Sequence, residues 1–466
     1  MPDRGVLNSK LRQVVLFTVD LFCTSVQCIT LPPGSSRGHR RVGILPGRRA
    51  TLQNLPEIVH TVPMTTLRRN IPLLYAFSFL QMTLFPMAVI TLFWKEHIGL
   101  SLSQILLLQS IFAVAMVVME YPSGYISDRI GYRTALTMAA ILGLAGWGYY
   151  TVATSFRDVL IAEVLLGIST SFISGTDSAL LFESLKANGA EGTYARCEGR
   201  STFFGQTGEA AGALFAGVLY ARYPLLPFFL QVAVWLLALA LTRGLTEPRR
   251  EPRQRGSHLA EAIASARYVF VENPRLRITV LLSVVLGLSS FYPVWLIQPY
   301  MRDCGVPLAS FGPVWAGANL IVALCAVSSH RLRAFLGDRG MILLVMALVL
   351  GGYLGLGVAA GVWGFLFYYL LTAMRGMRGP YMLHVAQAEI PSATRAGMLS
   401  LQSLCFRLAF ALTGPLVGTY ADAHGVGHTF RLIGWVYLVI LPPLVWLFLH
   451  QLRKPVLLKK QETTDG

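Results

Sequence analysis

Twelve long apolar segments, separated by polar connectors, constrain the fold of this chain more than any other feature of its sequence. The hydrocarbon core of a bilayer is about 30 Å thick, and a helix needs about 20 apolar residues to cross it with its backbone amides paired. The sequence therefore predicts an all-α membrane protein with twelve transmembrane helices. The predicted crossings span residues 72–94, 102–126, 134–153, 159–184, 201–220, 226–242, 278–299, 307–329, 341–359, 364–385, 396–421 and 432–450.

The charge composition agrees with a membrane location and argues against several other classes of protein. Only 13% of the residues are charged, against about a quarter in soluble domains. The formal charge of +16 comes from Lys and Arg in the connectors, so we expect a lipid bilayer and no nucleic acid as the partner. The six cysteines show no C-x-x-C spacing, and no phosphate-binding loop, H-E-x-x-H or G-x-S-x-G motif is present. We therefore expect neither an enzyme nor a bound metal or cofactor.

The distribution of Lys and Arg predicts the orientation of the chain. From Met64 onward, the connectors on the same side as both chain termini hold 25 Lys and Arg residues, and the connectors on the other side hold 5. This count places Arg375 and Arg378 at the inner end of their predicted helix. Positively charged connectors stay on the cytoplasmic side of a membrane. The count predicts an integral protein of the plasma (inner) membrane with both termini in the cytoplasm.

The longest connector divides the predicted helices into six plus six. In its second part, apolar residues recur at helical spacing from His258 to Val271, which predicts a short amphipathic helix at the membrane surface. The polar and interrupted N-terminal region fits neither half and is predicted to be poorly ordered, and Met64 would serve as a natural start. The expected parts are an extension at residues 1–70, a half at 71–246, a cytoplasmic linker at 247–276, a half at 277–450 and a cytoplasmic tail at 451–466.

The connector between the second and third predicted helices carries a specific motif. It reads Gly124-Tyr125-Ile126-Ser127-Asp128-Arg129-Ile130-Gly131-Tyr132-Arg133. This segment resembles the signature loop of the major facilitator superfamily, G-x-x-x-D-R-x-G-R-R, and departs from it at Tyr132, where a basic residue is usual. We expect Gly124 to allow close approach of another helix, Asp128 to face a helix N-terminus and Gly131 to turn the chain sharply. Arg129 and Arg133 would anchor at the anionic membrane surface.

The resemblance implies a major facilitator fold, in which two pseudo-symmetric halves of six helices enclose a solute path, and it implies a functional monomer. The connector at residues 328–340 retains Asp-Arg-Gly where the second half should echo the motif, although its spacing has degenerated. In relatives, an acidic residue at the end of helix 4 pairs with the signature arginine as a cytoplasmic latch. That role passes here to Arg129 with either Asp177 or Glu183.

The predicted fifth helix is rich in small residues and contains Gly205, Gly208, Gly212 and Gly217. It is similar to the motif G-x-x-x-G-P-x-x-G-G of drug-proton antiporters in the superfamily, but Glu209 stands in place of the proline. Helix 4 has Glu163 four residues before a glycine, where those antiporters carry an arginine. The chain thus resembles a divergent, drug-antiporter-like bacterial branch. The glycine face fits either close packing or a gating hinge.

Ionisable residues inside the predicted helices point to the chemistry, because a charge at the bilayer midplane is costly unless it is paired or hydrated. Glu209 and Arg407 fall near mid-depth, Glu163 lies nearer the outer end of helix 4, and Glu120 lies in the inner half of helix 2. We expect Glu120 as the first partner of Arg407 and Glu209 as the second. These groups form either a static ion pair or a site that exchanges protons.

These patterns predict a secondary active transporter that moves a small solute by alternating access, coupled to protons, with efflux by antiport as one form of this activity. The alternative is a transporter-like membrane receptor or scaffold that transports nothing. Aromatic and polar residues of helices 7 and 10 are the candidates for contact with the solute. They are Tyr292, Trp295, Gln298, Tyr369, His384 and Gln387.

Overall fold

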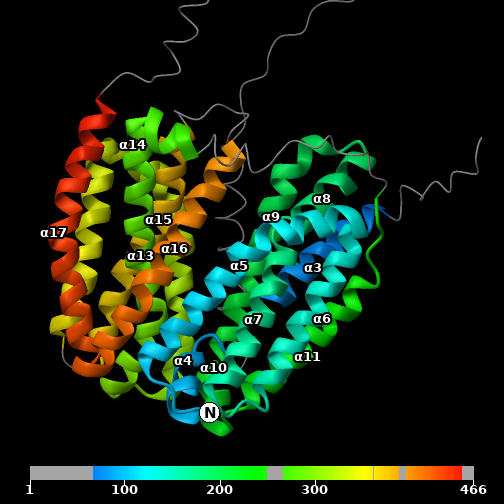
Figure 1. The fold of residues 1–466 in the computed structure, drawn as a ribbon, viewed down its shortest axis with the longest axis horizontal. Coiled ribbons are helices and arrows are strands. Elements are labelled where there is room, and N and C mark those ends of the chain that lie inside the picture. The colour runs from blue at the N-terminus through cyan, green and yellow to red at the C-terminus, as the bar shows by residue number, and fades with distance from the viewer. Residues whose placement is uncertain (1–66, 249–265, 360, 388–394, 454–466) are drawn as a thin grey trace, which may run out of the picture. The chain divides into compact units, whose positions relative to one another are not determined.

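The computed structural model describes residues 67–248, 266–359, 361–387 and 395–453, all of which belong to one unit, Met64–Gly466. Every regular element in these ranges is a helix (Figure 1). Most of the predicted extension, the first part of the predicted amphipathic helix and nearly all of the predicted tail lie outside the described residues. The extension is predicted to end at Asn70, but this residue is fully buried and begins the first helix.

The first half contains helices from Asn70 to Thr242. They are α3 (Asn70–Met82), α4 (Ile90–Leu92), η1 (Phe93–His97), α5 (Leu102–Ile130), α6 (Tyr132–Tyr150), α7 (Phe156–Ile173), α8 (Thr176–Ala187), η2 (Glu191–Thr193), α9 (Tyr194–Leu214), α10 (Ala216–Arg222) and α11 (Leu226–Thr242). The second half contains η3 (Tyr268–Glu272), α13 (Pro274–Asp303), η4 (Leu308–Ser310), α14 (Phe311–Val358), η5 (Gly364–Phe367), α15 (Tyr368–Gln387), α16 (Arg395–His424) and α17 (Val426–Leu452).

Within the described ranges, six helical segments are long and apolar enough to cross a membrane. One of them, Leu308–Val358, is 51 residues long and contains two of the predicted crossings. The predicted connector at residues 330–340 is therefore mostly helical. The chain bends within it at Gly337, whose φ of 67° and ψ of 177° a residue with a side chain rarely adopts.

Three predicted crossings are interrupted rather than continuous. The first stops at Met82 and resumes at Ile90, with Pro86 between the two parts. A proline has no amide hydrogen to donate and cannot continue a helix ladder. The fourth breaks between α7 and α8 at Gly175, which has a φ of +82°. The fifth begins at Tyr194, seven residues before its predicted start, and pauses at Phe215.

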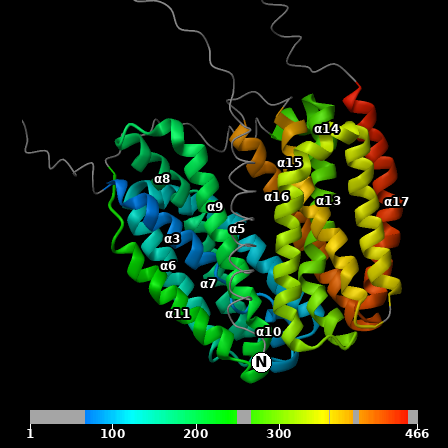
Figure 2. The same ribbon diagram turned by 180° about the vertical axis from the view of Figure 1, so that it is seen from behind.

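The two halves lie beside each other and touch along a small set of helices (Figures 1 and 2). The contacts between halves join α5 to α16, α9 to α14, α4 to α13, and α10 to both η4 and α14. We name the side on which α3 begins and α17 ends the tail side, and the other side the opposite side. Towards the opposite side the two groups of helices come together, whereas towards the tail side they separate (Figure 1).

Candidate functional site

On the opposite side, the broken first helix is held by two glutamines. Gln298 of α13 is fully buried, accepts a hydrogen bond from the amide of Thr91 at 2.9 Å and donates one to the carbonyl of Met87 at 2.8 Å. Gln231 of α11 accepts a hydrogen bond from the amide of Phe85 at 3.0 Å. Backbone groups that lack a partner inside lipid are costly, so these side chains replace the missing helix bonds. One glutamine comes from each half.

Charged residues close the same side. The carboxylate of Asp422, at the end of α16, accepts hydrogen bonds from the amides of Leu102 at 2.7 Å and Ser103 at 2.9 Å, which begin α5 in the other half. Arg302 of α13 forms an ion pair with Glu96 at 2.9 Å. Both contacts bridge the halves. An anion at a helix N-terminus is favoured by the unpaired amides and by the helix dipole.

Glycines bring the halves into backbone contact near these charges. A Cβ atom on Gly217 would strike the carbonyl of Leu308, and one on Gly312 would strike that of Ala213. Within the first half, a Cβ on Gly208 would overlap the carbonyl of Phe79 in α3. These contacts agree with the prediction that the glycines of the fifth predicted helix allow close packing. The alternative, a gating hinge, stays a prediction.

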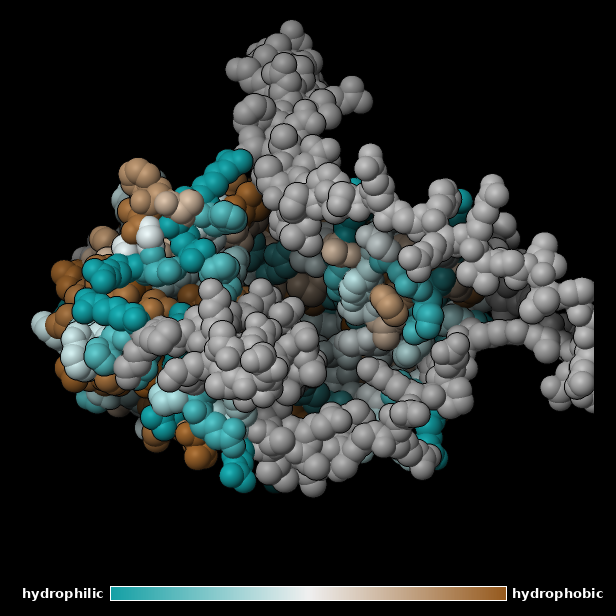
Figure 3. All heavy atoms as spheres, turned by 90° about the horizontal axis from the view of Figure 1, so that it is seen from above, coloured by the Kyte–Doolittle hydropathy of each residue, from teal (hydrophilic) through white to brown (hydrophobic). Residues whose placement is uncertain are grey.

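Towards the tail side, polar contacts between the halves join α5 to α16. The hydroxyl of Ser400 donates to Glu120 at 3.4 Å, and Arg407 reaches the sulfur of Met116 with its Nη1 at 2.9 Å. Figure 3, which views this side, shows a depression between the halves with hydrophilic residues at its visible wall.

The predicted partners of Arg407 are only partly in place. Its Nε donates to Ser403 at 3.2 Å, and no ion pair within 4 Å joins it to either Glu120 or Glu209 in the part of the chain that the structure describes. Glu120 lies one turn from Met116 and is close enough for its charge to act on Arg407. The first predicted partner is therefore nearby without direct contact, and the second lies elsewhere.

Glu209 bridges the halves through neutral groups. Its carboxylate accepts a hydrogen bond from the amide nitrogen of Asn319 at 2.9 Å and another from the indole nitrogen of Trp315 at 3.4 Å. Both partners lie on α14 in the second half. Among the described residues, the carboxylate is therefore stabilised without a cation in direct contact.

Glu163 is the most enclosed carboxyl of the predicted set. Its side chain is 5% exposed and accepts hydrogen bonds from the hydroxyl of Tyr150 in α6 and, at 3.0 Å, from the amide of Gln109 in α5. The Tyr150 ring stacks on Trp94, whose ring in turn stacks on Trp295 of the second half with centroids 5.8 Å apart. A row of aromatic rings thus connects the buried acid with the contact between halves.

The signature loop differs from its predicted role at one glycine. Gly124 is exposed and a Cβ there would meet nothing within 4 Å, so no helix approaches it closely in this conformation. Gly131 does turn the chain, with a φ of 106° between α5 and α6. The carboxylate of Glu247, which follows α11, accepts hydrogen bonds from the amides of Tyr132 at 2.8 Å and Arg133 at 2.7 Å. Glu247 therefore caps α6, and the role of Asp128 at a neighbouring helix N-terminus stays a prediction.

The predicted latch residues are not joined by an ion pair in the described ranges. Arg129 is exposed at the tail-side end of α5 and lies 4.7 Å from the ring centroid of Tyr125. Asp177 accepts a hydrogen bond from the amide of Ser178 at 2.8 Å at the start of α8, and Glu183 lies further along the same helix. The latch stays a prediction for a conformation closed on the tail side.

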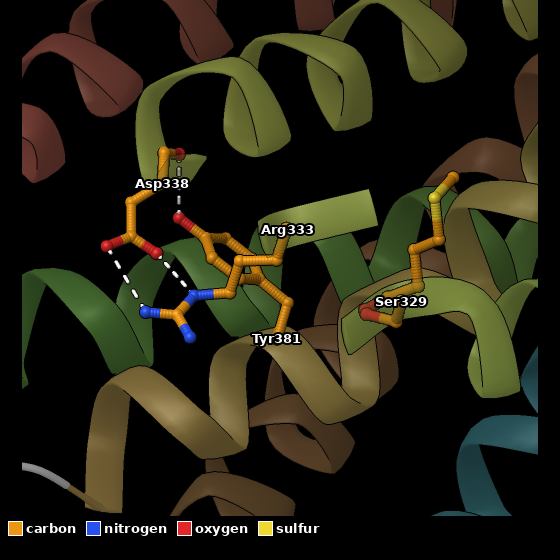
Figure 4. Close-up of polar contacts among 5 residues, drawn as sticks. Ser329, Arg333, Asp338 and Tyr381 are labelled. Atoms are coloured by element: carbon orange, nitrogen blue, oxygen red, sulfur yellow. Dashed lines mark hydrogen bonds and ion pairs between the residues drawn. The ribbon is translucent and has the colours of Figure 1, made fainter. Parts of the chain in front are cut away.

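The corresponding bend in the second half contains an ion pair (Figure 4). The Nε of Arg333 lies 2.6 Å from a carboxylate oxygen of Asp338, and the hydroxyl of Tyr381 in α15 donates to the Asp338 carbonyl at 3.0 Å. Asp338 directly follows the kinked Gly337. The degenerate echo of the motif thus fixes a bend in the long helix against its neighbour.

The predicted solute contacts are mostly packing residues in this conformation. Tyr292 is buried with its hydroxyl 2.6 Å from that of Thr413, Trp295 is buried in the ring stack, and both polar groups of Gln298 bind backbone. Tyr369 donates to the carbonyl of Val314 at 3.3 Å. His384 is exposed. The side chain of Gln387 lies outside the described residues.

The described residues contain no group of three or more His, Cys, Asp or Glu side chains that could hold a metal ion. Their four cysteines are free thiols.

Several functional residues were not identified from the sequence. Glu247 and Asp422 were missed because each caps a helix distant in sequence, and no local pattern signals such a contact. Arg375 and Arg378 were placed at the inner end of helix 10, but they lie twelve and nine residues before Gln387, well inside α15. The signal for them was present, since an arginine within an apolar run is unusual.

Comparisons with known proteins agree with this architecture. The sequence profile described as Major Facilitator Superfamily matches residues 73–409. The chain is 21% identical over 392 residues to an uncharacterized MFS-type transporter, YxaM, of Bacillus subtilis (strain 168), covering 78% of this chain and 92% of that one.

Solved structures show the same fold at low sequence identity. The nucleoside transporter NupG has a TM-score of 0.68 at 11% identity, covering 83% of this chain and 100% of that one. A bacterial homolog of the human lysosomal transporter Spinster, in an inward-facing and unoccupied conformation, has a TM-score of 0.66 at 16% identity, covering 84% of this chain and 99% of that one.

Proposed function

The chain belongs to the major facilitator superfamily and is a secondary transporter in a membrane, and from this premise we propose that it couples solute movement to protons through Glu163. Transport requires two conformations that open the solute path to one side at a time. The contacts of the opposite side and the depression on the tail side support the view that this conformation is open to the tail side. The similarity to an inward-facing structure adds to this support.

The observation that carries the proton proposal is the setting of Glu163. Its carboxyl is buried, and its two hydrogen bonds come from Tyr150 and Gln109, with no cation among the described contacts. Each donor stabilises the charged carboxylate. If a donor withdraws, the charge is left in a dry interior, and proton uptake then relieves the cost. Glu163 therefore takes up a proton in one conformation and releases it in the other.

Both donors are placed where movement of the halves can reach them. The ring of Tyr150 stacks on Trp94, which stacks on Trp295 of the second half. Gln109 is followed in α5 by Ser110, which packs closely against Gly414 of α16. A Cβ atom added to Gly414 would lie 3.2 Å from the Ser110 hydroxyl oxygen. Rocking of one half against the other would shift these contacts. The protonation of Glu163 and the direction of opening are thereby linked.

A measurement that needs no known solute tests this proposal. Val152 and Val362 lie on opposite-side connectors of different halves and are 68% and 41% exposed. Spin labels at these two positions in nanodiscs report opening of the opposite side through their distance, measured by double electron–electron resonance. We expect the distance distribution to change between acidic and neutral pH in the unsubstituted chain and to lose this response in Glu163→Gln. Glu191→Gln, at an exposed acid of η2, is the matched control and should respond normally.

Two results would contradict the assignment. A full pH response in Glu163→Gln would remove Glu163 as the proton site. Loss of the response in Glu209→Gln alone would transfer that function to the acid that contacts Asn319. In vesicles with an imposed pH gradient, the direction of proton movement is then compared with that of solute movement. Opposite directions indicate antiport, and so efflux, whereas the same direction indicates symport.

We further propose that the tail side faces the cytoplasm of a bacterial plasma membrane. The excess of Lys and Arg in tail-side connectors supports this orientation. Reporter fusions after residues 248 and 453 should both appear in the cytoplasm. Fusions on different sides of the membrane would refute the orientation.

A further inference from the structure

Two arginines of α15 lie at a depth similar to that of Glu209. Arg375 and Arg378 follow the start of α15 at Tyr368 by seven and ten residues, or about 10 and 15 Å along a helix. Asn319, which contacts Glu209, follows the start of α14 at Phe311 by eight residues, or about 12 Å. Both helices start on the opposite side.

Arg378 is held between helices by neutral groups only. Its Nη1 donates to the carbonyl of Ser283 in α13 at 3.0 Å, and its buried Nε has no hydrogen-bond partner. A Cβ on Gly287 would lie 2.8 Å from this Nη1 and 2.9 Å from the ring of Phe406. The absence of a side chain at Gly287 therefore makes room for the guanidinium. A half-buried cation whose buried Nε lacks a partner calls for an anion.

Arg375 adds a second positive charge at the same place. It is exposed, and its charge acts on Arg378 and on the hydroxyl of the buried Tyr368, which also lies within the field of Glu209. Among the described residues, no ion pair includes either arginine. The carboxylate of Glu209 is already stabilised by Asn319 and Trp315. Because Glu209 needs no cation, the two arginines leave an excess of positive charge among the described residues.

We propose that this group is the solute site and that it takes a small organic anion, whose acidic group binds Arg378 and Arg375. This inference rests on the proposed transport function. A carboxylate or a phosphate fits the planar donors of a guanidinium, and either would satisfy the Nε of Arg378. The anion would reach this site through the space that is open on the tail side.

Ligand-induced thermal stabilisation of the full-length protein in nanodiscs tests the chemistry. The probes are succinate for carboxylates, glycerol 3-phosphate for phosphates, and glycerol and choline as uncharged and cationic comparisons, all at matched ionic strength and one pH. We expect saturable stabilisation by at least one anion and none by glycerol or choline. Arg378→Gln should raise the half-saturating concentration about tenfold or more, as expected for loss of a hydrogen bond to a charged group.

Two further variants keep the test decisive. Arg375→Gln changes an exposed residue and should weaken anion binding even if Arg378→Gln does not fold. Arg277→Gln, at an exposed arginine near the tail-side end of α13, is the matched control and should bind like the unsubstituted chain. The proposal is overturned if choline or glycerol stabilises as much as both anions, or if Arg375→Gln binds the anion unchanged.

The outcome is separable from that of the proton proposal. Binding is measured at a single pH and without transport, so it does not depend on Glu163. Anion binding together with a normal pH response in Glu163→Gln would remove only the proton site. If the unsubstituted chain binds no anion but Glu163→Gln loses the pH response, only the anion site is removed.

Discussion

Asp422 offers the most direct test of how the opposite side is kept closed. The helix α5 begins with a capping box in which Ser101 binds the amide of Gln104, so this box leaves the amides of Leu102 and Ser103 free. Asp422 of the other half binds both, at 2.7 and 2.9 Å. Because these bonds cross between halves, they exist only while the opposite side is closed. Asp422→Ala removes them from one conformation and leaves the other unchanged.

The size of the effect follows from the cost of losing a helix cap. Such a loss costs about 0.5–2 kcal/mol, and a carboxylate that binds two amides belongs near the upper limit. A loss of about 2 kcal/mol changes the ratio of two conformations about 30-fold. A protein closed on the opposite side in about 99 of 100 molecules would then be open there in roughly a quarter of them.

Spin labels at Val152 and Val362 measure this ratio. We expect a second, longer distance to appear in Asp422→Ala and a smaller change in Asp422→Asn, which keeps one acceptor oxygen. Asp303→Ala removes another exposed acid on the same side and serves as the matched control. Identical distance distributions in Asp422→Ala and the unsubstituted chain would show that the two bonds do not hold this side closed.

Three further predictions concern stability. Glu247→Ala should lower the free energy of unfolding by about 0.5–2 kcal/mol through loss of the α6 cap, measured by thermal unfolding in detergent, and an unchanged melting temperature would contradict this. Gly208→Ala should abolish folded protein on size-exclusion chromatography because its Cβ overlaps the carbonyl of Phe79, whereas Gly124→Ala should fold normally; equal yields would be inconsistent with the packing. Gln298→Leu should destabilise the protein by about 2–6 kcal/mol, since it leaves two buried backbone groups unpaired at about 1–3 kcal/mol each, and a melting temperature like that of the unsubstituted chain would count against it.

The positions of the helices could be predicted from the sequence because crossing a bilayer is a local requirement. A run of about 20 apolar residues satisfies it whatever the neighbours are. The breaks were harder to predict, since residues 83–89 are as apolar as the rest of the first crossing and only Pro86 marks the interruption. What makes the break tolerable is Gln298 of the other half together with Gln231 of α11, and both are distant in sequence.

The candidate site shows the same limit. Glu163 was identified because a carboxyl in an apolar run is conspicuous, but its donors Tyr150 and Gln109 belong to other helices. Arg378 is predicted at the inner end of its helix but lies well inside α15, where an arginine is costly. That cost is met by a neutral carbonyl and by the space above Gly287, and neither leaves a trace in the local sequence.

The two glutamines at the broken first helix bear on how easily the protein can change conformation. Separation of the halves would detach Gln298 from Met87 and Thr91, while Gln231 would keep its bond to Phe85 within the first half. The groups released in this way lie at the mouth that the same movement opens. Incoming water can hydrate them as they are released, so rupture of these bonds raises little barrier.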